Sequence, residues 1–147
     1  MSVRVSVILA RKGADVATVE SSATVGEALR LLAEHDIGAL VVSGDGNRID
    51  GIISERDIVR RLADAGADII DVPVMQVMTA EVLTCTPDET ADEVMQTMTE
   101  RRARHLPVID DGRLVGIVSI GDVVKSRIDD LTTRARSMED YISGSPL

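Results

Sequence analysis

The sequence has very few aromatic side chains: its 147 residues include no Trp and no Phe, and Tyr141 is the only Tyr. A flat ligand would therefore have to be held between aliphatic side chains, because almost no ring is available to stack on it. Cysteine is nearly absent as well. Cys85 is the only one, so it has no partner for an internal disulfide. A lone thiol fits a reducing cytosol and predicts a cytoplasmic protein.

Positive charge is in deficit, and the formal net charge is −9. This argues against a nucleic-acid partner, whose binding depends on clustered Lys and Arg. No apolar run approaches the ~20 residues that span a bilayer. The stretch Val5 to Ala10 is too short for the apolar part of a secretory signal, and Arg11 and Lys12 interrupt it. We therefore expect no membrane partner. The length of the chain suits one compact domain or two halves that share a core.

What the sequence does contain is an internal repeat. An amphipathic segment opens at Thr24, and an equivalent one opens 66 residues later at Thr90. Both begin with the Thr-x-x-Glu pattern of a capping box, so both predict a helix start. In both, apolar residues recur at i, i+3, i+4 and i+7, the spacing of one helix face. These residues are Val25, Ala28, Leu29 and Leu32 in the first copy, and Ala91, Val94, Met95 and Met98 in the second.

Short apolar strands complete each copy. Each helix is followed by a strand, an Asp-Gly turn, a second strand and a second helix, which starts near Asp57 or Asp122. A further strand precedes each copy and places Cys85 at the position of Val19, so we interpret Cys85 as a packing residue. The strands are predicted at 16–19, 39–42 and 51–54 and, in the second copy, at 82–85, 106–109 and 116–119.

The repeat predicts the organisation of the chain. We expect a lead-in over 1–15, a first repeat over 16–65, a linker over 66–78, a second repeat over 79–127 and a C-terminal helix and tail over 128–147. The C-terminal helix has an apolar seam with alternating spacings of four and three, and it should end near Ile142, before Gly144 and Pro146. This seam either folds back on its own domain or pairs with another copy, and we predict a homodimer. The seam consists of Val124, Ile128, Leu131, Ala135, Met138 and Ile142.

The two copies resemble a tandem pair of cystathionine-β-synthase (CBS) domains, as in stand-alone bacterial CBS-domain proteins. The matching stretches are 37–42, 104–108 and the Gly-x-x-Ser-x-x-Asp endings at 51–57 and 116–122. The resemblance covers roughly residues 12–127. It implies an α+β fold in which two β-α-β-β-α units pack sheet to sheet with pseudo-twofold symmetry, called a Bateman module. It also implies a non-catalytic regulatory module with two clefts that bind AMP, ADP, ATP, NAD(H) or S-adenosylmethionine.

The Ser-x-x-Asp endings are the candidate nucleotide sites. Ser119 ends a strand and begins a helix, where free N–H groups and the helix dipole favour an anion. The Asp122 carboxylate could accept two hydrogen bonds from a ribose. Ser54 and Asp57 repeat this arrangement. The same pattern is also a capping box, but the other two helices use the longer Glu at this position, so we interpret Asp as favouring a ligand role.

The resemblance implies two pseudo-symmetric clefts. In the Asp122 cleft, adenine would lie on Ala17 and Ile37, and Lys12 and Arg104 would face the phosphates. Lys12 lies in a predicted loop, whereas the opposite linker at 78–79 supplies no cation, and Glu55 adds negative charge there. We therefore predict that the Asp122 cleft binds a mononucleotide better, while the Asp57 cleft is empty, weak or part of a dinucleotide site. The main cleft comprises Lys12, Ala17, Ile37, Gly38, Ala39, Arg104, His105, Pro107, Ser119, Gly121 and Asp122; the second comprises Ser54, Arg56, Asp57, Leu83 and Ala103.

No metal site and no catalytic group is predicted. His35 and His105 do not occupy equivalent repeat positions, and residues 45–56 lack the ligands of a calcium loop. No nucleophile–base pair stands out. We predict a sensor of energy or redox state that binds AMP, or else NAD(H) or ATP, and acts through an unidentified protein. The alternatives are a ligand-free oligomerisation or interaction scaffold and, disfavoured by the missing catalytic groups, an enzyme fragment.

Overall fold

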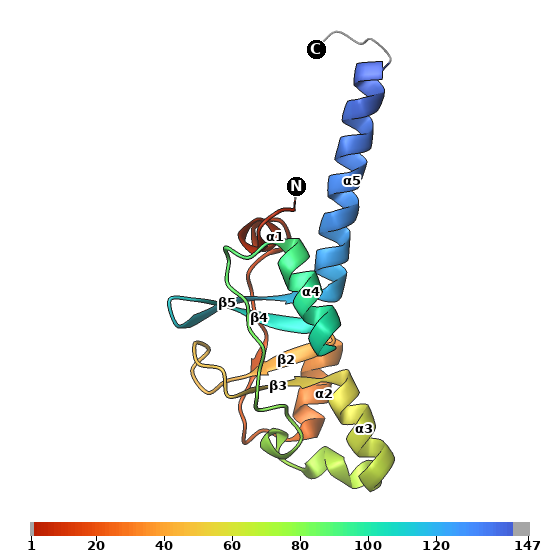
Figure 1. The fold of residues 1–147 in the computed structure, drawn as a ribbon. Coiled ribbons are helices and arrows are strands. Elements are labelled where there is room, and N and C mark those ends of the chain that lie inside the picture. The colour runs from red at the N-terminus through yellow and green to blue at the C-terminus, as the bar shows by residue number, and fades with distance from the viewer. Residues whose placement is uncertain (1, 143–147) are drawn as a thin grey trace.

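The computed structural model describes residues 2–142, and it consists of two similar halves (Figure 1). The predicted repeat of helix, two strands and helix is confirmed. The strand predicted at 82–85 is reduced to a single parallel bridge between Cys85 and Val108. The first half contains β1 (Thr18–Val19), α2 (Val25–His35), β2 (Ala39–Val42), β3 (Gly51–Ser54) and α3 (Glu55–Ala65); the second contains α4 (Ala91–Arg101), β4 (His105–Asp110), β5 (Arg113–Ser119) and α5 (Ile120–Ile142).

Each half has a small sheet. In the first, β2 pairs in parallel with β1 and antiparallel with β3. In the second, β4 and β5 form an antiparallel pair with a register shift at Val108/Ile109. Both hairpin turns project from the same side of the molecule (Figure 1). The two are joined there, because Leu114 N–H donates to the Asn47 carbonyl at 3.0 Å.

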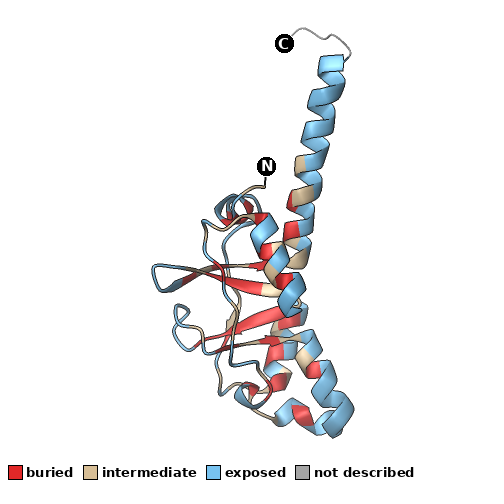
Figure 2. Cartoon of the chain, in the orientation of Figure 1, coloured by how far each residue is buried: buried red, intermediate tan, exposed pale blue. Residues whose placement is uncertain are grey.

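The predicted helix faces are buried in two apolar cores, one for each half (Figure 2). Leu29 is the exception, with 37% of its surface exposed. Cys85 is 2% exposed. Its burial, with the nearby charge of Glu89, raises the pKa of its thiol to about 12, so it is an inert packing residue.

The lead-in contains a helix that the sequence analysis did not predict, α1 (Val5–Lys12). It forms because Val5, Ile8 and Leu9 recur at helical spacing and are all buried in the core of the second half. The chain before it is also bound there, since Ala91 N–H donates to the Val3 carbonyl at 2.8 Å. The N-terminal segment therefore completes the second repeat.

The linker does the same for the first repeat. It forms two 3₁₀ helices, η1 (Gly66–Asp71) and η2 (Val74–Gln76). Val25 N–H donates to the Val72 carbonyl at 2.9 Å, and Val74 is fully buried in the first core. Each repeat is thus completed by the segment that precedes the other one. We call residues 2–12 and 66–78 the exchanged segments.

Two glycines hold the exchanged segments close to the sheets. A Cβ added at Gly116 would lie 2.7 Å from Leu9 Cδ2, and one added at Gly51 would lie 2.6 Å from Met78 Sδ, so any side chain would displace them. Leu9 and Met78 are 69 residues apart and occupy equivalent places. Three residues further on, the same offset relates Lys12 to Glu81, so the two clefts receive opposite charges.

The C-terminal helix extends far beyond the body. Its base packs beside α4 and β5, and the rest projects alone (Figure 1). It is helical as far as Ile142, the last described residue, and the predicted end before Gly144 and Pro146 lies outside the described residues. Among residues 2–142, no helix is both long and apolar enough to cross a membrane.

Candidate functional site

The helices α3 and α5 both begin with reciprocal capping bonds. The Asp57 N–H donates to Ser54 Oγ at 3.2 Å, and the Ser54 N–H donates to Asp57 Oδ2 at 3.0 Å. In α5, the Ser119 N–H donates to Asp122 Oδ2 at 2.8 Å. The expectation that Asp caps a helix less well than Glu was wrong: both Asp carboxylates accept the N-cap N–H, whereas the capping bonds of α2 and α4 run from the Glu N–H groups to the Thr oxygens. A structural role therefore accounts for both Asp residues before any ligand is considered.

Asp122 is also bonded to Lys12. Lys12 is not in a loop but ends α1, and its Nζ lies 2.7 Å from Asp122 Oδ2. The two side chains are 32% and 24% exposed. Burial raises the pKa of Asp122, but hydrogen bonds from Lys12 and Ser119 and the charge of Lys12 outweigh it, so the pKa lies below its ordinary value. The cation and the ribose acceptor predicted for this cleft thus bind each other.

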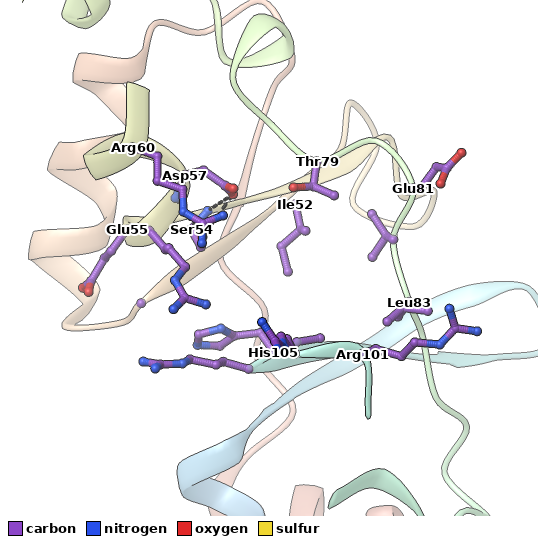
Figure 3. A pocket seen from close by; sticks show the side chains of 16 residues that line it. Ile52, Ser54, Glu55, Asp57, Arg60, Thr79, Glu81, Leu83, Arg101 and His105 are labelled. Atoms are coloured by element: carbon purple, nitrogen blue, oxygen red, sulfur yellow. Dashed lines mark hydrogen bonds between the residues drawn. The ribbon is translucent and has the colours of Figure 1, made fainter. Parts of the chain in front are cut away.

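A pocket of about 370 Å³ lies between the two halves, around Asp57 (Figure 3). The start of α3 forms one wall. The end of α4 and the chain through residues 79–83 form the others. Figure 3 shows Ser54, Asp57 and Arg60 facing His105 and Arg101 across the opening. The lining residues are Gly38, Ile52, Ser54, Glu55, Arg56, Asp57, Arg60, Thr79, Glu81, Val82, Leu83, Arg101, Arg102, Ala103, Arg104 and His105.

The pocket is rich in positive charge. Five arginines line it against three carboxylates, in a chain whose formal net charge is −9. The guanidinium group is the preferred protein partner of phosphate, because its donors match two oxygens at once. Aliphatic side chains from both halves supply apolar surface beside it, among them Ile52, Val82 and Leu83. The pocket therefore offers surfaces for an anionic group and for an apolar ring.

His105 lines the pocket where the two halves meet. An added Cβ on Gly38 would lie 3.4 Å from its ring, so the two halves are in contact here. Burial lowers the pKa of His105, although the negative charges of Asp122 and Glu55 act in the opposite direction. The imidazole is therefore neutral at pH 7, and an anion beside it would favour its protonation.

The structure brings together all five residues predicted for the second cleft, since each lines the pocket. Three residues assigned to the Asp122 cleft, Gly38, Arg104 and His105, line it as well. Ser119, Asp122 and Lys12 are joined by hydrogen bonds at the start of α5, where Gly121 is exposed. The remaining predicted residues serve the sheets and cores: Ala39 and Pro107 are buried in strands, and Ala17 and Ile37 are half-buried against the first core.

Sequence reasoning missed three of the arginines, Arg60, Arg101 and Arg102. Arg60 lies one turn after Arg56, and the other two precede Ala103 and Arg104, so the clustering of Arg in 101–104 was a signal that could have been used. Within residues 2–142, no group of three His, Cys, Asp or Glu side chains is arranged to hold a metal ion.

Comparison with known proteins identifies the repeated unit. The family model for the CBS domain matches residues 8–64 and 74–129. A CBS domain-containing mitochondrial protein of Arabidopsis thaliana, CBSX3, is 38% identical over 125 residues, which cover 82% of this chain and 61% of that protein. The chain thus spans less than two thirds of that relative.

Solved structures share the fold. A CBS-domain containing protein from Agrobacterium tumefaciens superposes with a TM-score of 0.82 and 45% identity, covering 85% of this chain and 99% of that one. A CBS domain protein from Pyrobaculum aerophilum was solved with AMP; its TM-score is 0.72 at 28% identity, over 82% and 89% of the two chains. The CBS domain pair of protein MJ0100, solved with 5′-methylthioadenosine and S-adenosyl-L-methionine, has a TM-score of 0.75 at 29% identity, over 85% and 95%.

Proposed function

Because the chain belongs to the CBS domain family and carries two copies in tandem, we propose that it is a non-catalytic regulatory module that binds an adenine nucleotide between its repeats. In this proposal it senses energy or redox state and signals to another protein. The observation that supports it best is the arginine-lined pocket between the halves, in a chain that is otherwise acidic. A ligand that touches both halves can change how they pack, provided that it binds the two arrangements unequally.

We propose that the Asp57 pocket, not the Asp122 cleft, is occupied first, which reverses the ranking made from the sequence. In the Asp122 cleft a ligand must first separate Lys12 from Asp122. In the Asp57 pocket the equivalent residue is Glu81, and the cations come from α3 and from the end of α4. Asp57 accepts the hydrogen bonds from Ser54 through Oδ2, which leaves Oδ1 for a ribose hydroxyl.

The charge of the pocket favours a phosphate-bearing ligand. Two structural relatives were solved with AMP or with S-adenosyl-L-methionine and methylthioadenosine. Five arginines would repel the positive sulfonium of S-adenosylmethionine and attract a phosphate. AMP is therefore our first candidate, with ATP or NAD(H) next.

Two neighbouring arginines on α3 provide a test with a built-in control. Arg60 lines the pocket and Arg61 does not. Isothermal titration with AMP, ATP and NAD(H) should show binding that Arg60→Ala weakens about tenfold, the loss of one charge-assisted hydrogen bond. Arg61→Ala should bind as the wild type does. No binding of any of these nucleotides would overturn the proposal and favour the ligand-free scaffold.

The two clefts are ranked by a second pair of variants. Asp57→Ala and Asp122→Ala each remove one capping carboxylate, at a cost of about 1 kcal/mol in stability. Asp122→Ala also removes the ion pair with Lys12, so it should be the less stable of the two. If the Asp57 pocket binds first, Asp57→Ala should weaken the tightest binding event and Asp122→Ala should leave it nearly unchanged. Equal losses, or a larger loss in Asp122→Ala, would overturn the ranking.

We also propose that the protein acts as a homodimer in the cytoplasm. The exposed apolar seam of α5 supports the first point. The free, buried thiol of Cys85 fits the second, since it needs no oxidising compartment.

A further inference from the structure

The helix α5 carries an unusual amount of exposed apolar surface. Its base is held to the body on one side only, through Val123 and Ser126, which are buried. The predicted seam lies roughly 100° around the helix axis from Val123, and it is exposed along its whole length. Half of the large exposed apolar side chains described for this chain lie on α5: Val124, Ile128, Leu131, Met138, Tyr141 and Ile142. Within residues 2–142, the seam is not covered by its own domain, so folding back is ruled out.

The charges of α5 alternate in blocks along its length. Reading from the N-terminus, the blocks are positive at 125–127, negative at 129–130, positive at 134–136 and negative at 139–140. The order is thus plus, minus, plus, minus. Read backwards it is minus, plus, minus, plus. A second copy of the same helix therefore complements the first only when it runs in the opposite direction.

We propose that the seam of α5 packs against α5 of a second copy in antiparallel orientation. This goes beyond the proposed homodimer by naming its surface and geometry, and it does not depend on nucleotide binding. With the pair centred at Thr133, every seam residue meets another across about 27 Å of helix. Val124 then faces Ile142, Ile128 faces Met138, and Leu131 faces Ala135, each twice by symmetry.

The flanking residues on the side of Lys125 and Glu139 agree with this register. In this antiparallel coiled coil, the residues that follow Val124, Leu131 and Met138 meet each other across the pair. Here Lys125 meets Glu139 at both ends of the pair, and the Asp129–Asp130 block lies level with Arg136. The helix dipoles also oppose each other favourably. A parallel pair would place each charged block beside the same block of its partner.

Oligomeric state tests the surface. Sedimentation of the full chain at tens of micromolar should give a dimer. Leu131→Asp lies on the projecting part of α5 and should shift it to monomer, because a charge would be buried in the central layer. Thr133→Asp adds the same charge on the opposite side of the helix and should remain dimeric. A monomeric wild type, or a dimer that Leu131→Asp does not weaken, would overturn the proposal.

Cross-linking tests the direction. An equal mixture of Lys125→Cys and Glu139→Cys chains should form a disulfide between positions 125 and 139 under mild oxidation. Neither variant alone should cross-link. In a parallel pair these positions are about 21 Å apart along the axis and could not be joined. Cys85 would not interfere, since it is buried. A dimer that loses association in Leu131→Asp but forms no 125–139 disulfide would overturn the antiparallel arrangement.

Discussion

Replacing Lys12 by Met tests whether the ion pair with Asp122 stabilises the fold. The variant keeps the aliphatic stem and removes the ammonium group. At 2.7 Å and an effective dielectric constant of about 20, the gross Coulomb attraction is about 6 kcal/mol. Desolvation of two partly buried charges and the lost freedom of the Lys side chain offset most of this. We expect a net loss of about 1 kcal/mol in the free energy of unfolding, at the upper end for exposed pairs.

The measurement is urea and thermal unfolding followed by circular dichroism, because the chain has no Trp to report by fluorescence. A loss of that size should lower the Tm by about 2–4 °C. Acidification adds a second signature. The pKa of Asp122 lies below its ordinary value of 3.8, so its contribution is present above that pH and is lost as the pH falls through the folded-state value. Lys12→Met should lose less stability than the wild type over this acidic range.

Arg11→Met is the matched control. Arg11 is the neighbouring cation in the last turn of α1 and has no hydrogen bond or ion pair among the described residues. It should cost little and leave the acid dependence unchanged. If both variants lose the same stability and titrate alike, the ion pair contributes nothing and the reasoning is refuted.

Two further predictions concern the contact between the halves and the packing of α1. The pKa of His105 is lowered from 6.5 by burial, so the unfolded chain binds the proton more readily, and stability should fall as the pH drops below 6.5. His105→Gln should therefore make the free energy of unfolding depend less on pH between pH 7.5 and 5.5. An unchanged pH dependence in the variant would contradict this. Gly116→Ala places a Cβ 2.7 Å from Leu9 and should lower the free energy of unfolding in urea by about 1–3 kcal/mol. The control Gly44→Ala has no atom within 4 Å of the added Cβ and should be nearly neutral. Equal costs in the two variants would show that α1 moves aside without strain.

The repeated core of the fold could be predicted because its signals are local. The i, i+3, i+4, i+7 pattern and the Thr caps fix α2 and α4, and the structure places these helices where the pattern does. The helix α1 was missed for the opposite reason. It spans eight residues, and its stability comes from residues such as Val94 and Val118, which are distant in the chain.

The candidate site was predicted in its residue types but not in its arrangement. The pair of Lys12 and Asp122 joins residues 110 positions apart, and nothing local marks it. The pocket depends on arginines from α3 and from the end of α4, which converge only in the folded chain. The comparison of Asp with Glu failed because reach at a helix start depends on backbone geometry as well as side-chain length.

The exchanged segments make the two halves interdependent. Residues 2–12 complete the second core, and residues 66–78 complete the first. A fragment cut between the repeats would therefore retain a lead-in helix with nothing to pack against and would lack the cover of its own core. Removing the first dozen residues should loosen the half that lies farthest along the chain, while β1 and α2, which follow directly, keep their packing. The duplication visible in the sequence has thus produced a single cooperative unit, which should melt in one transition.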